Sequence, residues 1–257
     1  ISQQHGHWDA RGPGADDTVG AVATKTLLQG ETKARATTVF MKSLMAVTGA
    51  LFVFFVLMHM YGNLKILWGR AAFDEYAEHL RTMLTPILPH RGFLTLFEVV
   101  LVVALVLHAY SAFYLWSKAH GARTNRYAVK IASGKAARSK MMRWGGVALL
   151  AFVIFHLIQF TIAQVNFNSA VRVDPTSPGD LLIAAFKLWW VVLIYVIAMV
   201  ALGLHLFHGV WSMAQTLGWA SSASRRKTWQ AIAHTVAGVT IIGFLVPPFA
   251  ILFGLVK

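Results

Sequence analysis

Five long apolar stretches limit what this chain can fold into. Each is long enough, at a helical rise of about 1.5 Å per residue, to cross a hydrocarbon layer of about 30 Å. Each is apolar on nearly every side, which is typical of membrane-spanning helices and not of amphipathic helices in soluble proteins. The stretches are residues 39–64, 93–116, 144–165, 181–213 and 231–256.

The composition agrees with a membrane protein. Of the 257 residues 57% are hydrophobic and only 13% are charged, which does not suit a soluble surface. The absence of Cys excludes disulfides, thioether-attached haem and an iron–sulfur cluster held by this chain alone. We therefore predict an all-α fold, an integral membrane bundle of five transmembrane helices over residues 39–257. A polar N-terminal segment, residues 1–38, precedes it, and we expect no cleavable signal peptide there.

The charged residues predict the orientation. The chain has 23 Lys and Arg against 10 Asp and Glu, and a net charge of +13. Most basic residues lie before the first stretch, between the second and third, and between the fourth and fifth. The positive-inside rule then places the N-terminus in the cytoplasm and the C-terminus outside. Because cytoplasmic loops explain the excess charge, we expect no nucleic-acid partner. The outer loop, residues 65–92, has apolar residues at helical spacing and is predicted to form a short amphipathic helix.

Four of the 11 histidines fall well inside the predicted spans, one in each of the first four. They are separated by 49, 48 and 49 residues, and they are His59, His108, His156 and His205. Ionisable side chains at membrane depth are costly to bury and are functional candidates by default. A simple hydrogen bond across a helix interface explains one such histidine more readily than four.

Intramembrane imidazoles without Cys or a carboxylate cluster indicate haem iron as the metal. Depth predicts which histidines meet. His59 and His156 each lie roughly 25 Å beyond the inner basic residues, whereas His108 and His205 lie roughly 10 Å from inner aromatic residues. We therefore predict an outer haem iron held by His59 and His156 and an inner haem iron held by His108 and His205. The two haems would be stacked across the bilayer.

From about residue 36 onward the chain resembles a known family. It is similar to the cytochrome b, or membrane-anchor, subunit of succinate dehydrogenases and fumarate reductases in its single-chain, five-helix, di-haem form. The similarity is greatest to actinobacterial members. The segments that carry it are HMYGNLK at 59–65, PILPH at 86–90, LVLH at 105–108, IFH at 154–156 and HLFHG at 205–209.

The resemblance implies a subunit of respiratory complex II in a bacterial cytoplasmic membrane, linking the tricarboxylic acid cycle to electron transport. Two haem b groups would bind to the four histidines already named. A flavoprotein subunit with FAD and an iron–sulfur subunit would be the cytoplasmic partners. Electrons would pass through this non-flavin subunit of a succinate:quinone oxidoreductase to a membrane quinone, menaquinone. The oligomeric state and the direction of turnover stay open.

Two departures from the family matter. Some fumarate reductases have a proton-transferring Glu two residues before the fourth haem ligand, where this chain has Gly203. A haem-coupled proton path of that kind is therefore not implied. Some relatives in the broad group also replace haem by a cluster, which here would need Cys from another subunit.

A quinone site needs an apolar slot with polar groups at the quinone carbonyls. The outer end offers five such residues, which we expect to converge beside the outer haem: Tyr61, Asn63, Arg81, His90 and Glu98. Glu98 is either a proton relay or a residue at the outer boundary. An inner site would use Ser43, His208 and Trp211, but it would leave the outer haem without an electron acceptor.

Two other functions remain open. Another quinone-linked cytochrome b, such as the membrane subunit of a hydrogenase or formate dehydrogenase, would share the four histidines but have different soluble partners. A transporter or proton channel could use intramembrane histidines as relay groups. Such a protein would be colourless.

Overall fold

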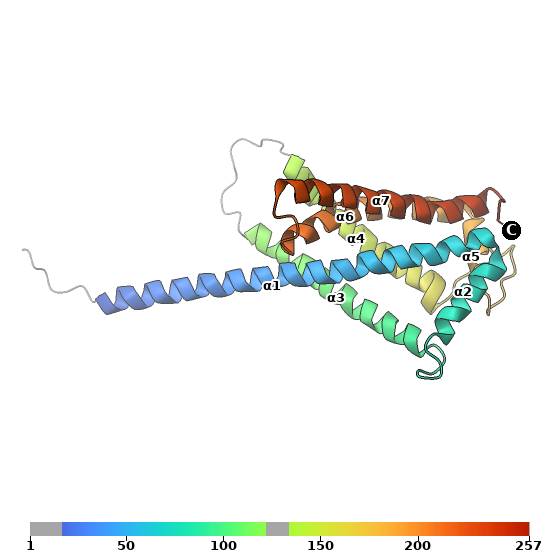
Figure 1. Ribbon diagram of the computed structural model, residues 1–257, viewed down its shortest axis with the longest axis horizontal. Coiled ribbons are helices and arrows are strands. Elements are labelled where there is room, and N and C mark those ends of the chain that lie inside the picture. The colour runs from blue at the N-terminus through green and yellow to red at the C-terminus, as the bar shows by residue number, and fades with distance from the viewer. Residues whose placement is uncertain (1–16, 122–133, 257) are drawn as a thin grey trace, which may run out of the picture. The chain divides into compact units, whose positions relative to one another are not determined.

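The computed structural model describes residues 17–121 and 134–256, and all the regular structure in these ranges is helical (Figure 1). Residues 1–16 of the predicted N-terminal segment and residues 122–133 of the basic loop lie outside these ranges. The chain divides into two units, Ile1–Met41 and Lys42–Lys257. The elements are α1 (Asp17–Leu64), the 3₁₀-helix η1 (Lys65–Trp68), α2 (Arg70–Thr82), α3 (Gly92–Gly121), α4 (Gly134–Leu157), the π-helix η2 (Ile158–Ile162), α5 (Pro178–Phe186), α6 (Trp189–Thr216) and α7 (Ala223–Leu252).

Within the described residues, five helical segments are long and apolar enough to cross a membrane, which confirms the predicted all-helical class and its five spans. The short helix α2 lies between the first and second spans, and α5 lies between the third and fourth. They are Thr37–Trp68, Gly92–Ala119, Lys140–Ile162, Trp189–Thr216 and Ala223–Leu252.

The fourth predicted stretch, residues 181–213, is wrong at its beginning. Its first residues belong to α5, a separate short helix, and Leu188 is extended, with φ −93° and ψ 113°, so that α6 begins only at Trp189. The residues of α5 from Leu181 to Phe186 are buried by protein. A short buried helix and the first turns of a span have the same hydropathy, so the sequence pattern cannot separate them.

A compact apolar core lies where α5 meets the beginning of α6 and the end of α7. Phe73 of α2 and several aromatic residues of α4 and η2 pack against it. Because these side chains come from segments far apart in the sequence, from Ile66 to Val256, the core holds one end of the second unit together. Its buried members are Ile66, Leu182, Ile183, Ala185, Phe186, Val191, Val192, Tyr195, Ala250, Ile251 and Val256.

The fifth span, unlike the fourth, begins earlier than predicted, at Ala223 and not at residue 231. Ser222 caps α7, with its hydroxyl oxygen accepting a hydrogen bond from the Arg225 backbone N–H at 3.3 Å, so the basic residues 225–227 are helical. The helix continues through Pro247 and Pro248. In contrast, the third span ends at Ile162 and not at residue 165, after its last turn has widened into the π-helix η2.

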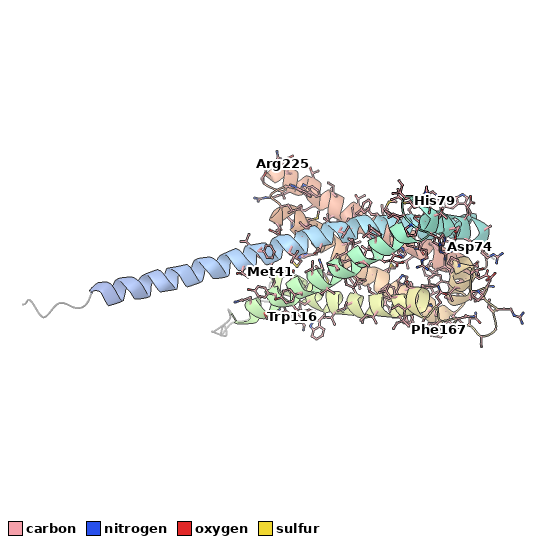
Figure 2. All side chains as sticks on the ribbon, turned by 90° about the horizontal axis from the view of Figure 1, so that it is seen from below. Met41, Asp74, His79, Trp116, Phe167 and Arg225 are labelled. Carbon is pink, nitrogen blue, oxygen red and sulfur yellow. The ribbon has the colours of Figure 1, made fainter. Side chains whose placement is uncertain are left out.

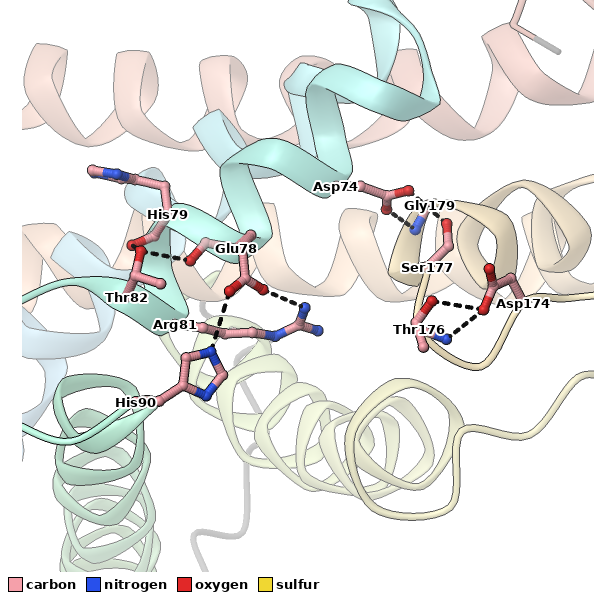
Figure 3. A network of polar contacts seen from close by, with 10 residues as sticks. All are labelled: Asp74, Glu78, His79, Arg81, Thr82, His90, Asp174, Thr176, Ser177 and Gly179. Atoms are coloured by element: carbon pink, nitrogen blue, oxygen red, sulfur yellow. Dashed lines mark hydrogen bonds and ion pairs between the residues drawn. The ribbon is translucent and has the colours of Figure 1, made fainter. Parts of the chain in front are cut away.

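The predicted amphipathic helix is α2, and hydrogen bonds and an ion pair join it to α5 and to the residue before α5. Asp74 accepts hydrogen bonds from the Ser177 hydroxyl at 2.6 Å and from the Gly179 backbone N–H at 2.8 Å (Figure 3). Arg70 forms an ion pair with Asp180 at 2.9 Å, and this carboxylate holds the pKa of the Arg70 guanidinium above its ordinary value. A carboxylate at the first turn of α5 satisfies free backbone N–H groups and suits the helix dipole.

The second unit has two distinct ends. Figure 2 shows Asp74, His79 and Phe167 at one end, and Trp116 and Arg225 at the other. The first end carries α2, α5 and their acidic residues, and the second carries the basic start of α7. The candidate site described below lies on the long helices that run between these ends.

Candidate functional site

The structure brings the four intramembrane histidines together in two pairs. His59 of α1 faces His156 of α4 with ring centroids 5.7 Å apart and an interplanar angle of 82°. His108 of α3 faces His205 of α6 at 6.3 Å and 58°. These are the two pairs expected from depth, and all four rings are half-buried.

The spacing of both pairs fits one metal ion between two imidazoles. A metal–nitrogen bond of about 2 Å on each side puts the two ring centroids about 6 Å apart. Within residues 17–121 and 134–256, no group of three or more His, Asp or Glu side chains could hold a metal ion. Each pair thus offers two ligands, which is the number that a six-coordinate haem iron takes from the protein.

Flat aromatic side chains surround the outer pair. His59 stacks on Phe55 at 5.3 Å and lies 5.8 Å from the ring of Phe244. His156 stacks on Phe152 at 5.9 Å and lies 5.5 Å from Phe160. Such apolar, planar walls suit a flat macrocycle and keep water away from it.

The sequence analysis missed two residues at His156: one contacts the ring, and the other accepts a hydrogen bond from the first. Its Nδ1 lies 3.0 Å from the Tyr195 hydroxyl, which donates to Gln159 Oε1 at 3.0 Å. Gln159, three residues after His156, is a polar residue in an apolar span, and this was the available signal. Tyr195 lies within the long apolar run of α6, and nothing in its local sequence indicated its role.

The inner pair has a different set of partners. His108 Nδ1 lies 3.0 Å from the Thr48 hydroxyl, which itself donates to the Leu44 carbonyl at 2.8 Å. Thr48 therefore accepts the Nδ1 proton, and Nε2 of His108 is left as a lone-pair donor for a metal. His205 Nδ1 is buried and has no hydrogen-bond partner in the described part of the chain.

Two glycines lie against the inner pair in equivalent positions. A Cβ added at Gly49 of α1 would lie 3.5 Å from Cε1 of His108, and one at Gly146 of α4 would lie 3.6 Å from Cε1 of His205. Each glycine thus lies beside a histidine of a neighbouring helix, at a distance where an added methyl group would make an ordinary van der Waals contact. This near-repeat agrees with the regular spacing of the four histidines in the sequence.

Gly203, which stands where some fumarate reductases that the sequence resembles have a proton-transferring Glu, faces α7. A Cβ at this position would overlap the Ile241 side chain. The place that a longer side chain would need is therefore filled by an aliphatic group.

The structure describes a direct contact for each of the five expected quinone residues. Arg81 and His90 both contact Glu78, with Arg81 Nη1 3.3 Å from Oε2 and His90 Nε2 3.2 Å from Oε1 (Figure 3). The hydrogen bonds from His90 and Arg81 lower the pKa of the Glu78 carboxyl. Glu98 pairs instead with Arg91, at 3.8 Å. Glu78 was missed because nothing in the sequence indicated that residues 81 and 90 would meet at its carboxylate.

The other two expected residues lie near η1. Asn63 donates to the His59 carbonyl at 2.8 Å, within its own helix. Tyr61 contacts Tyr76 edge-on at 6.0 Å and has the Lys65 ammonium 4.7 Å from its ring centroid. Burial raises the pKa of the Tyr76 hydroxyl. In the described residues, no hydrogen bond, ion pair or ring contact joins Tyr61 or Asn63 to residues 81, 90 or 98.

Comparison with known proteins adds no family to this geometry. No protein-family model matches the sequence, and a search of curated proteins finds no match. The functional proposal therefore depends on the paired histidines and on the sequence motifs around them.

Proposed function

We propose that this chain is the di-haem cytochrome b membrane-anchor subunit of a succinate:quinone oxidoreductase. One observation carries the proposal: four histidines from four spans form two pairs whose rings are 5.7 Å and 6.3 Å apart. Each spacing suits two axial ligands of one haem iron. Haem bound at these pairs would supply one-electron transfer at two depths of the membrane.

The chain's own residues would hold and orient these groups. His59 and His156 are the proposed ligands of the outer haem, and His108 and His205 those of the inner haem. Thr48 accepts the Nδ1 proton of His108, which orients the ring and leaves Nε2 free. The phenylalanine side chains around the outer pair exclude water.

The soluble partners follow from the resemblance in the motifs around the histidines. We propose a flavoprotein subunit with FAD and an iron–sulfur subunit on the cytoplasmic side of a bacterial inner membrane. The N-terminus would be cytoplasmic and the C-terminus outside, because the basic segments favour that orientation. Electrons would leave the chain to menaquinone.

The proposed quinone site stays at the outer end, because two haems at different depths are useful when electrons must reach that side. Arg81 and His90 are the strongest candidates, since both reach the same carboxylate from α2 and from the loop before α3. Tyr61, Asn63 and Glu98 would line other parts of the approach. The competing inner site would depend on His208.

A spectrum of the purified membrane complex tests the proposal. We expect a reduced-minus-oxidised difference of b type, a pyridine haemochrome count of two haems per chain, and co-purifying flavoprotein and iron–sulfur subunits with succinate dehydrogenase activity. Co-purification of hydrogenase or formate dehydrogenase subunits would instead favour another quinone-linked cytochrome b. A colourless protein would contradict haem binding and favour a transporter.

A further inference from the structure

A chain of three polar side chains lies beside the outer histidine pair. It runs from His156 Nδ1 to the Tyr195 hydroxyl and on to Gln159 Oε1, with both distances 3.0 Å. Tyr195 is 6% exposed and Gln159 is fully buried. Burying polar groups in an apolar surrounding is costly, and it is tolerated only where they bond to one another.

The direction in which these hydrogen bonds donate suits a histidine that binds a metal through Nε2. Such a histidine carries its proton on Nδ1 and can only donate there. The Tyr195 oxygen then accepts from His156, while its own proton points at Gln159 Oε1. Both hydrogen bonds run the same way, and bonds in series strengthen one another.

The local helix geometry places Gln159 in this series of hydrogen-bonded side chains. Gln159 lies in η2 (Ile158–Ile162), the π-helix that follows α4 and begins two residues after His156. π-helical turns are rare and occur frequently at functional sites. The Gln159 Nε2 atom is buried without a hydrogen-bond partner, so the residue's described hydrogen bond is the one through Oε1 to Tyr195.

The described contacts of His108 and His205 differ from this arrangement. His205 Nδ1 has none in the described residues. His108 contacts the Thr48 hydroxyl, which is also bound to a backbone carbonyl of its own helix. Among the described contacts of the paired histidines, the phenol hydrogen bond held by a buried amide occurs at His156.

From this arrangement, and resting on the proposed function, we propose that Tyr195, held by Gln159, is a positioning residue that lowers the reduction potential of the outer haem. An acceptor at Nδ1–H increases the basicity of the imidazole, and a more basic axial ligand favours the oxidised iron. The same bond fixes the orientation of the His156 ring. The inner haem would not respond to Tyr195.

The test is a potentiometric titration of both haem components in the purified complex of the full chain. Tyr195→Phe keeps the ring that packs on Phe152 at 5.0 Å and on Phe186 at 4.9 Å, and it removes the hydroxyl. We expect an upward shift of the outer midpoint potential and no shift of the inner one. Gln159→Leu should shift the outer potential in the same direction by less, because Tyr195 can still accept from His156.

The matched control is Tyr110→Phe, the same change at an exposed tyrosine of α3, which should shift neither potential. An unchanged outer potential in Tyr195→Phe with both haems present would overturn the inference and leave the proposed function intact. Equal shifts of both components would overturn it too. If Tyr195→Phe loses the outer haem, an unchanged potential in Gln159→Leu refutes the inference. A parent chain without haem would refute the proposed function together with the inference.

Discussion

At the scale of single residues, the orientation of a paired histidine depends on the hydrogen-bond partner of its Nδ1 atom. Thr48 and Tyr195 contact the Nδ1 atoms of His108 and His156 at 3.0 Å each. These contacts leave the Nε2 atoms as the available lone-pair donors. The two histidines of a pair are far apart in the sequence, but we expect both to bind the same iron through Nε2.

We expect His59→Ala and His156→Ala to remove the same b-type spectral component, because one iron needs both rings of the pair. His108→Ala and His205→Ala should remove the other component. Difference spectra of the four variants check this expectation. Loss of one common component in His59→Ala and His108→Ala would contradict the pairing.

The Glu78 carboxylate should make the loop between α2 and α3 sensitive to acid. The folded-state pKa of Glu78 is lowered by His90 and Arg81, so its contribution to stability is complete above the unfolded pKa of about 4.3 and is lost as the pH falls through the lowered value. Amide hydrogen exchange of residues 83–91, corrected for intrinsic rates, should therefore become faster as the pH falls through the lowered pKa of Glu78.

In Glu78→Gln the same segment should exchange rapidly at neutral pH as well, with little further change in acid. Glu75→Gln, an exposed position on the same helix, serves as the control and should behave like the parent chain. An identical pH profile in the parent and Glu78→Gln would show that the carboxylate does not hold the loop.

At the scale of elements, the short helices organise one end of the second unit. α5 is buried in the core, and α2 is bound to its first turn through Asp74. Loops 65–92 and 163–177, which are separate in sequence, are thus parts of one assembly. The long helices are joined there by specific polar contacts as well as by apolar packing.

Asp74→Ala should destabilise this assembly. It leaves the Ser177 hydroxyl and the Gly179 N–H without their acceptor, which costs about 1–3 kcal/mol. We expect a lower thermal unfolding midpoint for the detergent-solubilised protein. Asp174→Ala removes an acceptor that Thr176 of the same loop uses, and it should have a smaller effect. Equal midpoints for Asp74→Ala and the parent would exclude a stabilising role for this contact.

At the scale of the whole molecule, five helices in the described part of the chain have the length and composition of membrane spans. An odd number of crossings would put the two ends of the chain on opposite sides of the membrane. The same reasoning separates the segment before α5 from the connection between α6 and α7. Both segments contain exposed positions at which the orientation can be tested.

The absence of Cys in the chain allows labelling without background. Arg172→Cys and Ser221→Cys place a thiol at exposed positions of these two segments. With an impermeant reagent on intact cells we expect Arg172→Cys to be labelled, and Ser221→Cys to be labelled only after the membrane is opened. Labelling of both in intact cells would refute the proposed topology.

Local composition alone determined the helical class and the five spans, because hydropathy over a window of residues measures the preference for lipid directly. Sequence position along each span was also enough to match His59 with His156 and His108 with His205 in depth. Only the tertiary structure decided that α5 is separate from α6, since a buried helix and a lipid-facing one are equally apolar. It also decided the partners Tyr195 and Glu78, because side chains from distant elements meet through packing, which no local pattern records.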